Sequence, residues 1–205
     1  MSKLTITTFL TLDGVMQAPG APEEDRSGQF EHGGWLAPYA DADMGRFMTE
    51  VFDRADAFLL GRGTYEIFAN YWPRVTDPSH PIAARLNALP KHVASRTLGQ
   101  VTWNNSTLLR DPVAEVASLK GRYARELQVH GSAGLAQALV ARDLVDEMNL
   151  LVYPVVLGKG KRLFGTGGIP TAYELSRTRV TGRGVTITTY RRKGRPAYGS
   201  MATEA

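Results

Sequence analysis

Strand-type and helix-type hydrophobic patterns alternate along the first two thirds of this 205-residue sequence, and this alternation limits the possible folds more than any other feature. Between residues 3 and 12, side chains alternate between two faces and many are β-branched, which predicts a strand. Between residues 41 and 55, apolar side chains recur at the i, i+3, i+4, i+7 spacing of an amphipathic helix. Similar switches recur as far as residue 142. Such alternation favours a mostly parallel sheet flanked by helices.

The end of the chain contains strand patterns alone, so we expect an antiparallel C-terminal edge on that sheet. The predicted fold class is therefore α/β, with one domain over residues 1–192 and a flexible tail over residues 193–205. We expect further helices at 64–70, 82–89, from Pro112 onward, and at 132–142. We expect strands at 4–12, 57–60, 91–94, 127–129, 147–157 and 185–190 to share one sheet, with a hairpin partner at 173–180.

Composition excludes several classes of function. The chain has no cysteine, so disulfides, zinc–thiolate sites, iron–sulfur clusters and a thiol nucleophile are excluded. The four histidines have no metal-ligand spacing, so we expect no metal. The net charge of +4 comes without a dense basic stripe, so we expect no nucleic-acid partner. No apolar run reaches 18 residues and residues 1–5 do not begin a signal peptide, so we expect no membrane partner and a cytoplasmic location.

Two junctions between a predicted strand and a predicted helix contain glycine. They are Leu-Gly-Arg-Gly-Thr-Tyr-Glu at residues 60–66, where Thr64 could cap the helix, and Val-His-Gly-Ser-Ala-Gly-Leu at residues 129–135. Helix N-termini carry unpaired N–H groups and a positive dipole end, so they suit phosphate. Each junction could equally be a tight turn with no ligand. A third stretch, Gly-Lys-Gly-Lys-Arg at residues 158–162, lacks the upstream glycine and the Ser/Thr of a phosphate-binding P-loop, so we exclude that interpretation.

Five stretches follow one another along the chain: Thr-Leu-Asp-Gly at 11–14, Leu-Gly-Arg-Gly-Thr-Tyr-Glu at 60–66, Lys-His-Val-Ala-Ser-Arg-Thr-Leu at 91–98, Val-His-Gly-Ser at 129–132 and Pro-Val-Val-Leu-Gly-Lys-Gly at 154–160. Taken together, they resemble the dihydrofolate reductase-like family, and within it the reductase domain of the bifunctional riboflavin-biosynthesis deaminase-reductase. The resemblance extends from about Lys3 to Arg191 and implies a three-layer fold, with a sheet flanked by helices.

The resemblance implies NADPH as cofactor, bound across the strand ends. It assigns the pyrophosphate to the first junction and the adenosine ribose with its 2′-phosphate to Ser95 and Arg96. It assigns a further approach of the cofactor to the second junction. The implied cofactor-binding residues are Gly61, Arg62, Gly63, Thr64, Ser95, Arg96, Gly131, Ser132, Ala133 and Leu135.

For catalysis the resemblance offers two aspartates. Asp43 and Phe47 match the spacing of the acid and the ring-packing phenylalanine in folate reductases, whereas the riboflavin-type relatives emphasise Asp13. Both stay candidates. The implied substrate-binding residues are Gly14, Met16, Trp35 and Phe47. The segment 17–40 is long, acidic and rich in glycine and proline, with an exposed-looking Trp35, which disfavours folate itself as substrate.

The predicted function is NADPH-dependent transfer of a hydride to a C=N or C=O group of a small pteridine- or pyrimidine-like heterocycle. Two alternatives are a non-catalytic nucleotide-binding module of the same fold and a flavin-binding variant. The resemblance also implies a homodimer, because the riboflavin-type relatives pair through their sheets and the C-terminal strands form an unprotected edge.

Overall fold

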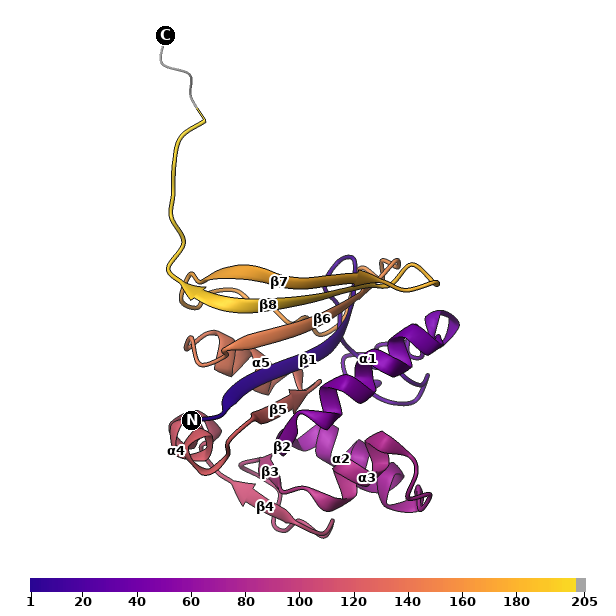
Figure 1. Cartoon of the computed structure of the whole chain (residues 1–205). Coiled ribbons are helices and arrows are strands. Elements are labelled where there is room, and N and C mark those ends of the chain that lie inside the picture. The colour runs from indigo at the N-terminus through magenta and orange to yellow at the C-terminus, as the bar shows by residue number, and fades with distance from the viewer. Residues whose placement is uncertain (202–205) are drawn as a thin grey trace.

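The computed structural model describes residues 1–201, and the strands of this part form one eight-stranded sheet (Figure 1). The strands are β1 (Lys3–Thr11), β2 (Ala55–Gly61), β3 (Lys91–Ala94), β4 (Ser106–Leu109), β5 (Glu126–His130), β6 (Glu147–Tyr153), β7 (Ala172–Val180) and β8 (Thr186–Gly194). Their order is β4-β3-β2-β5-β1-β6-β8-β7. Pairing is parallel from β4 to β6 and antiparallel from β6 through β8 to β7, as predicted.

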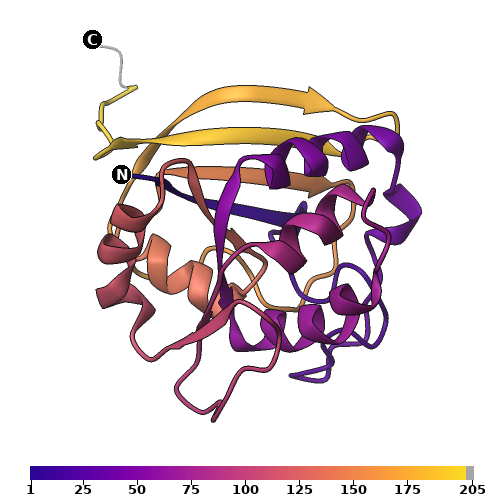
Figure 2. The same ribbon diagram turned by 60° about the horizontal axis from the view of Figure 1, so that its bottom comes forward.

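Helices cover both faces of the sheet, which makes three layers (Figure 2). The helices are α1 (Ala42–Asp53), α2 (Arg62–Tyr71), α3 (Pro81–Ala88), α4 (Pro112–Arg122) and α5 (Ala133–Val140), with 3-10 turns at Ala37–Tyr39 and Trp72–Arg74. Side chains of α1, α2 and α3 pack into one apolar core, and those of α4 and α5 pack into the other. The predicted fold class is confirmed.

The period-two pattern of β1 explains how the strand joins both cores. Leu4, Ile6 and Leu10 point to the α4–α5 face and are almost fully buried. The opposite face carries threonines and Phe9, whose ring packs edge-on against Tyr153 at a centroid distance of 6.1 Å. Both faces of this central strand are therefore covered, as expected for a parallel sheet.

Local chemistry sets several element boundaries. Asp41 caps α1 by accepting a hydrogen bond from Met44 N, and Asp111 caps α4 in the same way through Ala114 N. Strand β6 ends at Tyr153, four residues before the predicted end, where Pro154 has no N–H to continue the ladder. The edge strand β4 was not among the predicted strands, because its four residues are too few to show a period.

The chain ends differ slightly from the prediction. Strand β8 continues to Gly194, so residues 193 and 194 belong to the sheet rather than to the tail. Residues 195–201 have no regular secondary structure and run away from the sheet (Figure 1). The rest of the predicted tail, 202–205, lies outside the described residues. Within residues 1–201, no helix is both long and apolar enough to cross a bilayer.

Candidate active site

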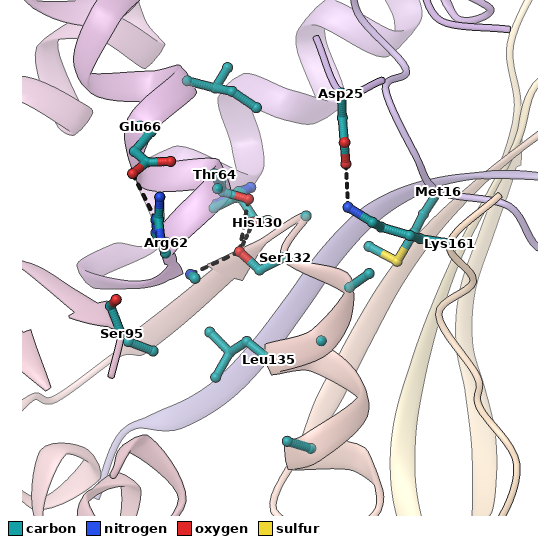
Figure 3. A pocket seen from close by; sticks show the side chains of 18 of the residues that line it. Met16, Asp25, Arg62, Thr64, Glu66, Ser95, His130, Ser132, Leu135 and Lys161 are labelled. Carbon is teal, nitrogen blue, oxygen red and sulfur yellow. Dashed lines mark hydrogen bonds and ion pairs between the residues drawn. The ribbon is translucent and has the colours of Figure 1, made fainter. Parts of the chain in front are cut away.

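A large pocket opens toward the carboxyl ends of the parallel strands, with a volume of about 1270 Å³ (Figure 3). In open α/β sheets this edge is where ligands bind, because loops and helix N-termini meet there. Strands β1, β2, β3 and β5 each contribute to its wall, and the first turns of α2, α4 and α5 do so as well. All ten residues predicted to bind the cofactor line this one pocket.

The first predicted junction forms the turn between β2 and α2. Gly61 is the N-cap of α2, and no side chain caps this helix, so the predicted Thr64 cap is wrong. A Cβ at position 61 would lie 3.0 Å from Ser132 Oγ, which explains the glycine. The Arg62 guanidinium donates to Glu66 Oε1 at 2.8 Å and to Thr97 Oγ1 at 2.9 Å, so it is held at the rim of the pocket.

The second junction turns the chain from β5 into α5 through two left-handed residues, Gly131 with φ +57° and Ser132 with φ +60°. Ser132 Oγ accepts a hydrogen bond from Gly61 N at 2.9 Å and donates one to Thr64 Oγ1 at 2.8 Å. This hydroxyl therefore ties the two helix N-termini together, as Figure 3 shows. Helix α5 also has no side-chain cap. The two uncapped N-termini suit an anion, since their first N–H groups lack partners within the helix.

The predicted adenosine end lies where β3 stops. Ser95 Oγ accepts from Thr97 N and Leu98 N, so this hydroxyl shapes its own turn. The Arg110 guanidinium donates to the carbonyl oxygens of Ser95 and Leu98, both at 2.9 Å, and braces the same turn. Arg96 is exposed on the pocket wall and has no hydrogen bond or ion pair with any other residue in the range 1–201. An unpaired guanidinium suits a second phosphate.

The opposite end is closed by the segment after β1. Met16 lines the pocket, as predicted, beside an ion pair of 2.6 Å between Lys161 Nζ and Asp25 Oδ2 (Figure 3). Gln17 fastens the segment by donating to Asp25 O and Ser27 O and by accepting from Lys161 N. Burial raises the pKa of the Glu24 carboxyl, which accepts from Gly20 N and Ala21 N.

Neither predicted catalytic aspartate lines the pocket. Asp43 lies in the first turn of α1, where it pairs with Arg46 and accepts from Gly182 N in the β7–β8 turn. Phe47 is also outside the pocket lining, because its side chain is buried in the core under α1. The structure therefore does not bring these two residues into the pocket, because this helix presents apolar side chains to the sheet, and the folate-type assignment stays a prediction.

Asp13 is a structural clamp. Its carboxylate accepts hydrogen bonds from Thr11 Oγ1 at 2.5 Å, Leu157 N at 3.2 Å and Gly158 N at 2.9 Å, and it pairs with Arg162 at 3.3 Å. The hydrogen bond from Thr11, with those from the two backbone N–H groups, lowers the pKa of Asp13 to about 2. A carboxyl group with this pKa cannot serve as a proton donor near neutral pH.

Two of the predicted substrate residues also lie outside the pocket. Gly14 forms the turn after β1 with φ +80°. Trp35, expected to be exposed, is 7% exposed, and its indole N–H donates to Gln17 O at 2.8 Å. Its ring packs against Tyr153 in the α1–α3 core.

Several pocket residues were missed by the sequence reasoning, among them Arg110, Lys161 and His130. Lys161 belongs to the glycine- and lysine-rich stretch at residues 158–162 that was excluded as a P-loop. This stretch does contribute a residue to the pocket, although not as a phosphate-binding P-loop. His130 immediately precedes the second junction, but one histidine at the end of a strand carries no signal of its own.

A three-layer α/β fold with a pocket between two uncapped helix N-termini at the ends of parallel strands is the architecture expected for the dihydrofolate reductase-like class. The particular family follows from comparison with known proteins: the chain belongs to the RibD C-terminal domain family, whose model matches residues 2–187. It is 29% identical to the uncharacterized protein YyaP of Bacillus subtilis strain 168 over an alignment of 165 residues. The alignment covers 79% of this chain and 80% of the relative.

Two solved structures share the fold. One is a proposed riboflavin biosynthesis protein from Shewanella sp. PV-4, with a TM-score of 0.66 and 21% identity over 93% of this chain and 99% of that one. The other is a pyrimidine reductase-like protein from Corynebacterium diphtheriae, with a TM-score of 0.61 and 12% identity over 94% of this chain and 92% of that one.

Proposed function

We propose that this protein is an NADPH-dependent reductase that transfers a hydride to a C=N or C=O carbon of a small heterocycle. The observation that carries the proposal is the convergence of ten residues from three separate segments on one pocket. They are Gly61, Arg62, Gly63, Thr64, Ser95, Arg96, Gly131, Ser132, Ala133 and Leu135. Membership of a reductase-like family supports the same conclusion.

In this proposal the N-termini of α2 and α5 bind the pyrophosphate, because their N–H groups and dipoles favour negative charge. Arg96 contacts the 2′-phosphate, and Met16 and the segment after it cover the nicotinamide. The bound cofactor supplies the hydride.

The protein's part is to bind, orient and exclude bulk water. The two carboxylates that the segment after Met16 contributes to the pocket lining are engaged: Asp25 pairs with Lys161, and Glu24 accepts two backbone N–H groups. We therefore propose that water, rather than an aspartate of the chain, delivers the proton to the reduced ring.

A matched pair of glycine variants tests cofactor binding. Gly134 lies in the first turn of α5 on the pocket wall, and Gly45 lies in the first half of α1 outside the lining; both are exposed and have open space where a Cβ would lie. Gly134→Asp adds a negative charge where the pyrophosphate would bind, so NADPH affinity should fall about tenfold or more by fluorescence titration. Gly45→Asp should leave the affinity unchanged. Equal affinities for both variants would contradict the proposed phosphate site.

Turnover separates this proposal from its alternatives. Oxidation of NADPH is followed by absorbance with a panel of pteridines and pyrimidines, and consumption with one of them is expected. A non-catalytic nucleotide-binding module, favoured by the absence of both predicted aspartates from the pocket lining, would bind NADPH and oxidise none. A flavin-binding variant would instead bind FMN more tightly than NADPH in the same titration.

A further inference from the structure

A chain of buried polar side chains runs along β5 from the surface to the pocket. Glu126, Gln128 and His130 alternate along the strand and face α1, and each is at least 95% buried. At the outer end, Arg54 Nε donates to Glu126 Oε1 at 2.7 Å. Burying three polar side chains in a row is costly unless each is paired, so the arrangement needs an explanation.

The hydrogen bonds in this chain determine the proton position on His130. Gln128 Nε2 donates to Glu126 Oε2 and to Val51 O, both at 2.7 Å, and both of these partners are acceptors. The amide oxygen of Gln128 must therefore face His130 Nε2, which lies 3.0 Å away. Because that oxygen can only accept, the proton of the neutral imidazole is on Nε2 and Nδ1 carries a lone pair.

The imidazole is also held in orientation and in charge state. Its ring stacks on Phe52 at a centroid distance of 4.4 Å and an interplanar angle of 12°. Burial lowers the pKa of His130 to about 3, so the ring is neutral at physiological pH. Charge state, tautomer and ring plane are thus all set by the protein.

The other ring nitrogen, Nδ1, is unpartnered among the described residues, and it belongs to a residue that lines the pocket. Nδ1 of His130 has no hydrogen-bond partner within residues 1–201. Among these residues, the side-chain N and O atoms that are both fully enclosed and without a partner are His92 Nδ1 and Ser106 Oγ, so Nδ1 of His130 is not fully enclosed. His130 lines the pocket beside Thr64 and Ser132 (Figure 3). An acceptor of fixed direction is therefore available to a ligand on the pocket floor.

A donor lies next to it on the neighbouring strand. Thr7 is directly opposite His130 in the register of β1 and β5 and also lines the pocket. Thr7 Oγ1 accepts from Asn149 Nδ2 at 3.0 Å, and its hydroxyl donates to no acceptor among the described residues. A donor beside an acceptor complements a ring edge that has an N–H next to a C=O.

We propose that His130 is a recognition residue for the heterocyclic substrate, with Nδ1 accepting a hydrogen bond from a ring N–H. Arg54, Glu126 and Gln128 are positioning residues that hold the imidazole for that contact. The inference rests on the proposed function for the identity of the ligand, but the state of the imidazole does not depend on it.

Nitrogen-15 NMR of histidine-labelled protein tests the positioning step, since the chain has only four histidines and a His130→Phe spectrum assigns the signal. A neutral ring with its proton on Nε2 is expected throughout pH 5 to 8. In Gln128→Met the fixed acceptor is gone, and signal from the Nδ1–H tautomer should appear. A charged ring in the wild type, or a proton on Nδ1, would overturn the proposal.

Uracil and 1,3-dimethyluracil test the recognition step, because the second keeps both carbonyl groups and lacks every N–H. With NADP⁺ present, the wild type should bind uracil about tenfold more tightly than 1,3-dimethyluracil. His130→Asn, which keeps an acceptor near the Nδ1 position, should retain most of this preference, and His130→Gln, which places its polar atoms near the Nε2 position, should lose it. Thermal melting of both variants checks that they fold.

The outcomes separate the two proposals. Equal preference in His130→Asn and His130→Gln, or no binding of uracil by the wild type, would overturn the role of His130 while leaving NADPH binding intact. Failure of the wild type to bind NADPH would instead overturn the proposed function, and the tautomer measurement would still stand.

Discussion

Replacing Asp13 with asparagine should cost stability. The Asp13 side chain is 18% exposed and holds the turn after β1 against residues 157, 158 and 162. Folding lowers its pKa from the ordinary value of 3.8 to about 2. A shift of this size corresponds to about 2 kcal/mol of folding free energy at neutral pH. In a domain of this length that is roughly 4–8 °C in Tm.

The pH dependence follows from the direction of the shift. Because the folded pKa is below the unfolded one, the contribution is fully present above about pH 4 and is lost as the pH falls toward 2. Urea unfolding of wild type and Asp13→Asn at pH 7 and 5 should therefore differ by about 2 kcal/mol, and the difference should shrink below pH 4.

Asp53→Asn is a matched control, since Asp53 forms an ion pair with Arg85 at 3.2 Å and is 55% exposed. Its effect should stay within about 0.5 kcal/mol. NADPH affinity should be unchanged in both variants. If Asp13→Asn unfolds like wild type but oxidises no NADPH with a substrate that wild type reduces, then Asp13 is a catalytic residue and the clamp interpretation is wrong.

Three further predictions concern the pocket and the sheet edge. Arg96→Ala should weaken NADPH about 10- to 150-fold by fluorescence titration and NADH little, since only NADPH has a 2′-phosphate; equal losses would remove Arg96 from this role. Ser132→Ala removes the hydroxyl that joins Gly61 N and Thr64 Oγ1, so Tm should fall by about 2–8 °C and NADPH affinity should drop as well; a variant that matches wild type in both would show that the link is dispensable. We also propose a homodimer through the exposed edge strand β7, on which Leu175 and Val180 are at least half exposed; a monomer mass by light scattering at micromolar concentration would argue against it.

Much of the architecture was predictable, because local patterns report burial directly. The period-two pattern of β1, the amphipathic pattern of α1 and the Asp111–Pro112 helix start are each confirmed close to their predicted positions. The two glycine junctions were found for the same reason, since a strand end followed by a helix start is a local event.

The catalytic assignments depended on where each aspartate side chain points and what it contacts, and a local sequence pattern does not contain this information. Asp43 has the spacing of a folate-type acid, but its carboxylate accepts a hydrogen bond from Gly182 N in the β7–β8 turn. Asp13 follows the correct strand, yet backbone N–H groups more than 140 residues away bind it. Trp35 lies in a polar segment, but the core beside Tyr153 accommodates its ring.

From its periodicity and turn chemistry alone, the sequence determined the class of fold and the two helix N-termini that face the pocket. Only the tertiary structure decided which polar side chains reach that pocket. His130 shows why: its tautomer depends on Gln128, Glu126 and Val51, which become neighbours only when α1 packs on β5. Secondary structure follows from interactions within a few residues, whereas the charge and proton state of a buried group follows from everything packed around it.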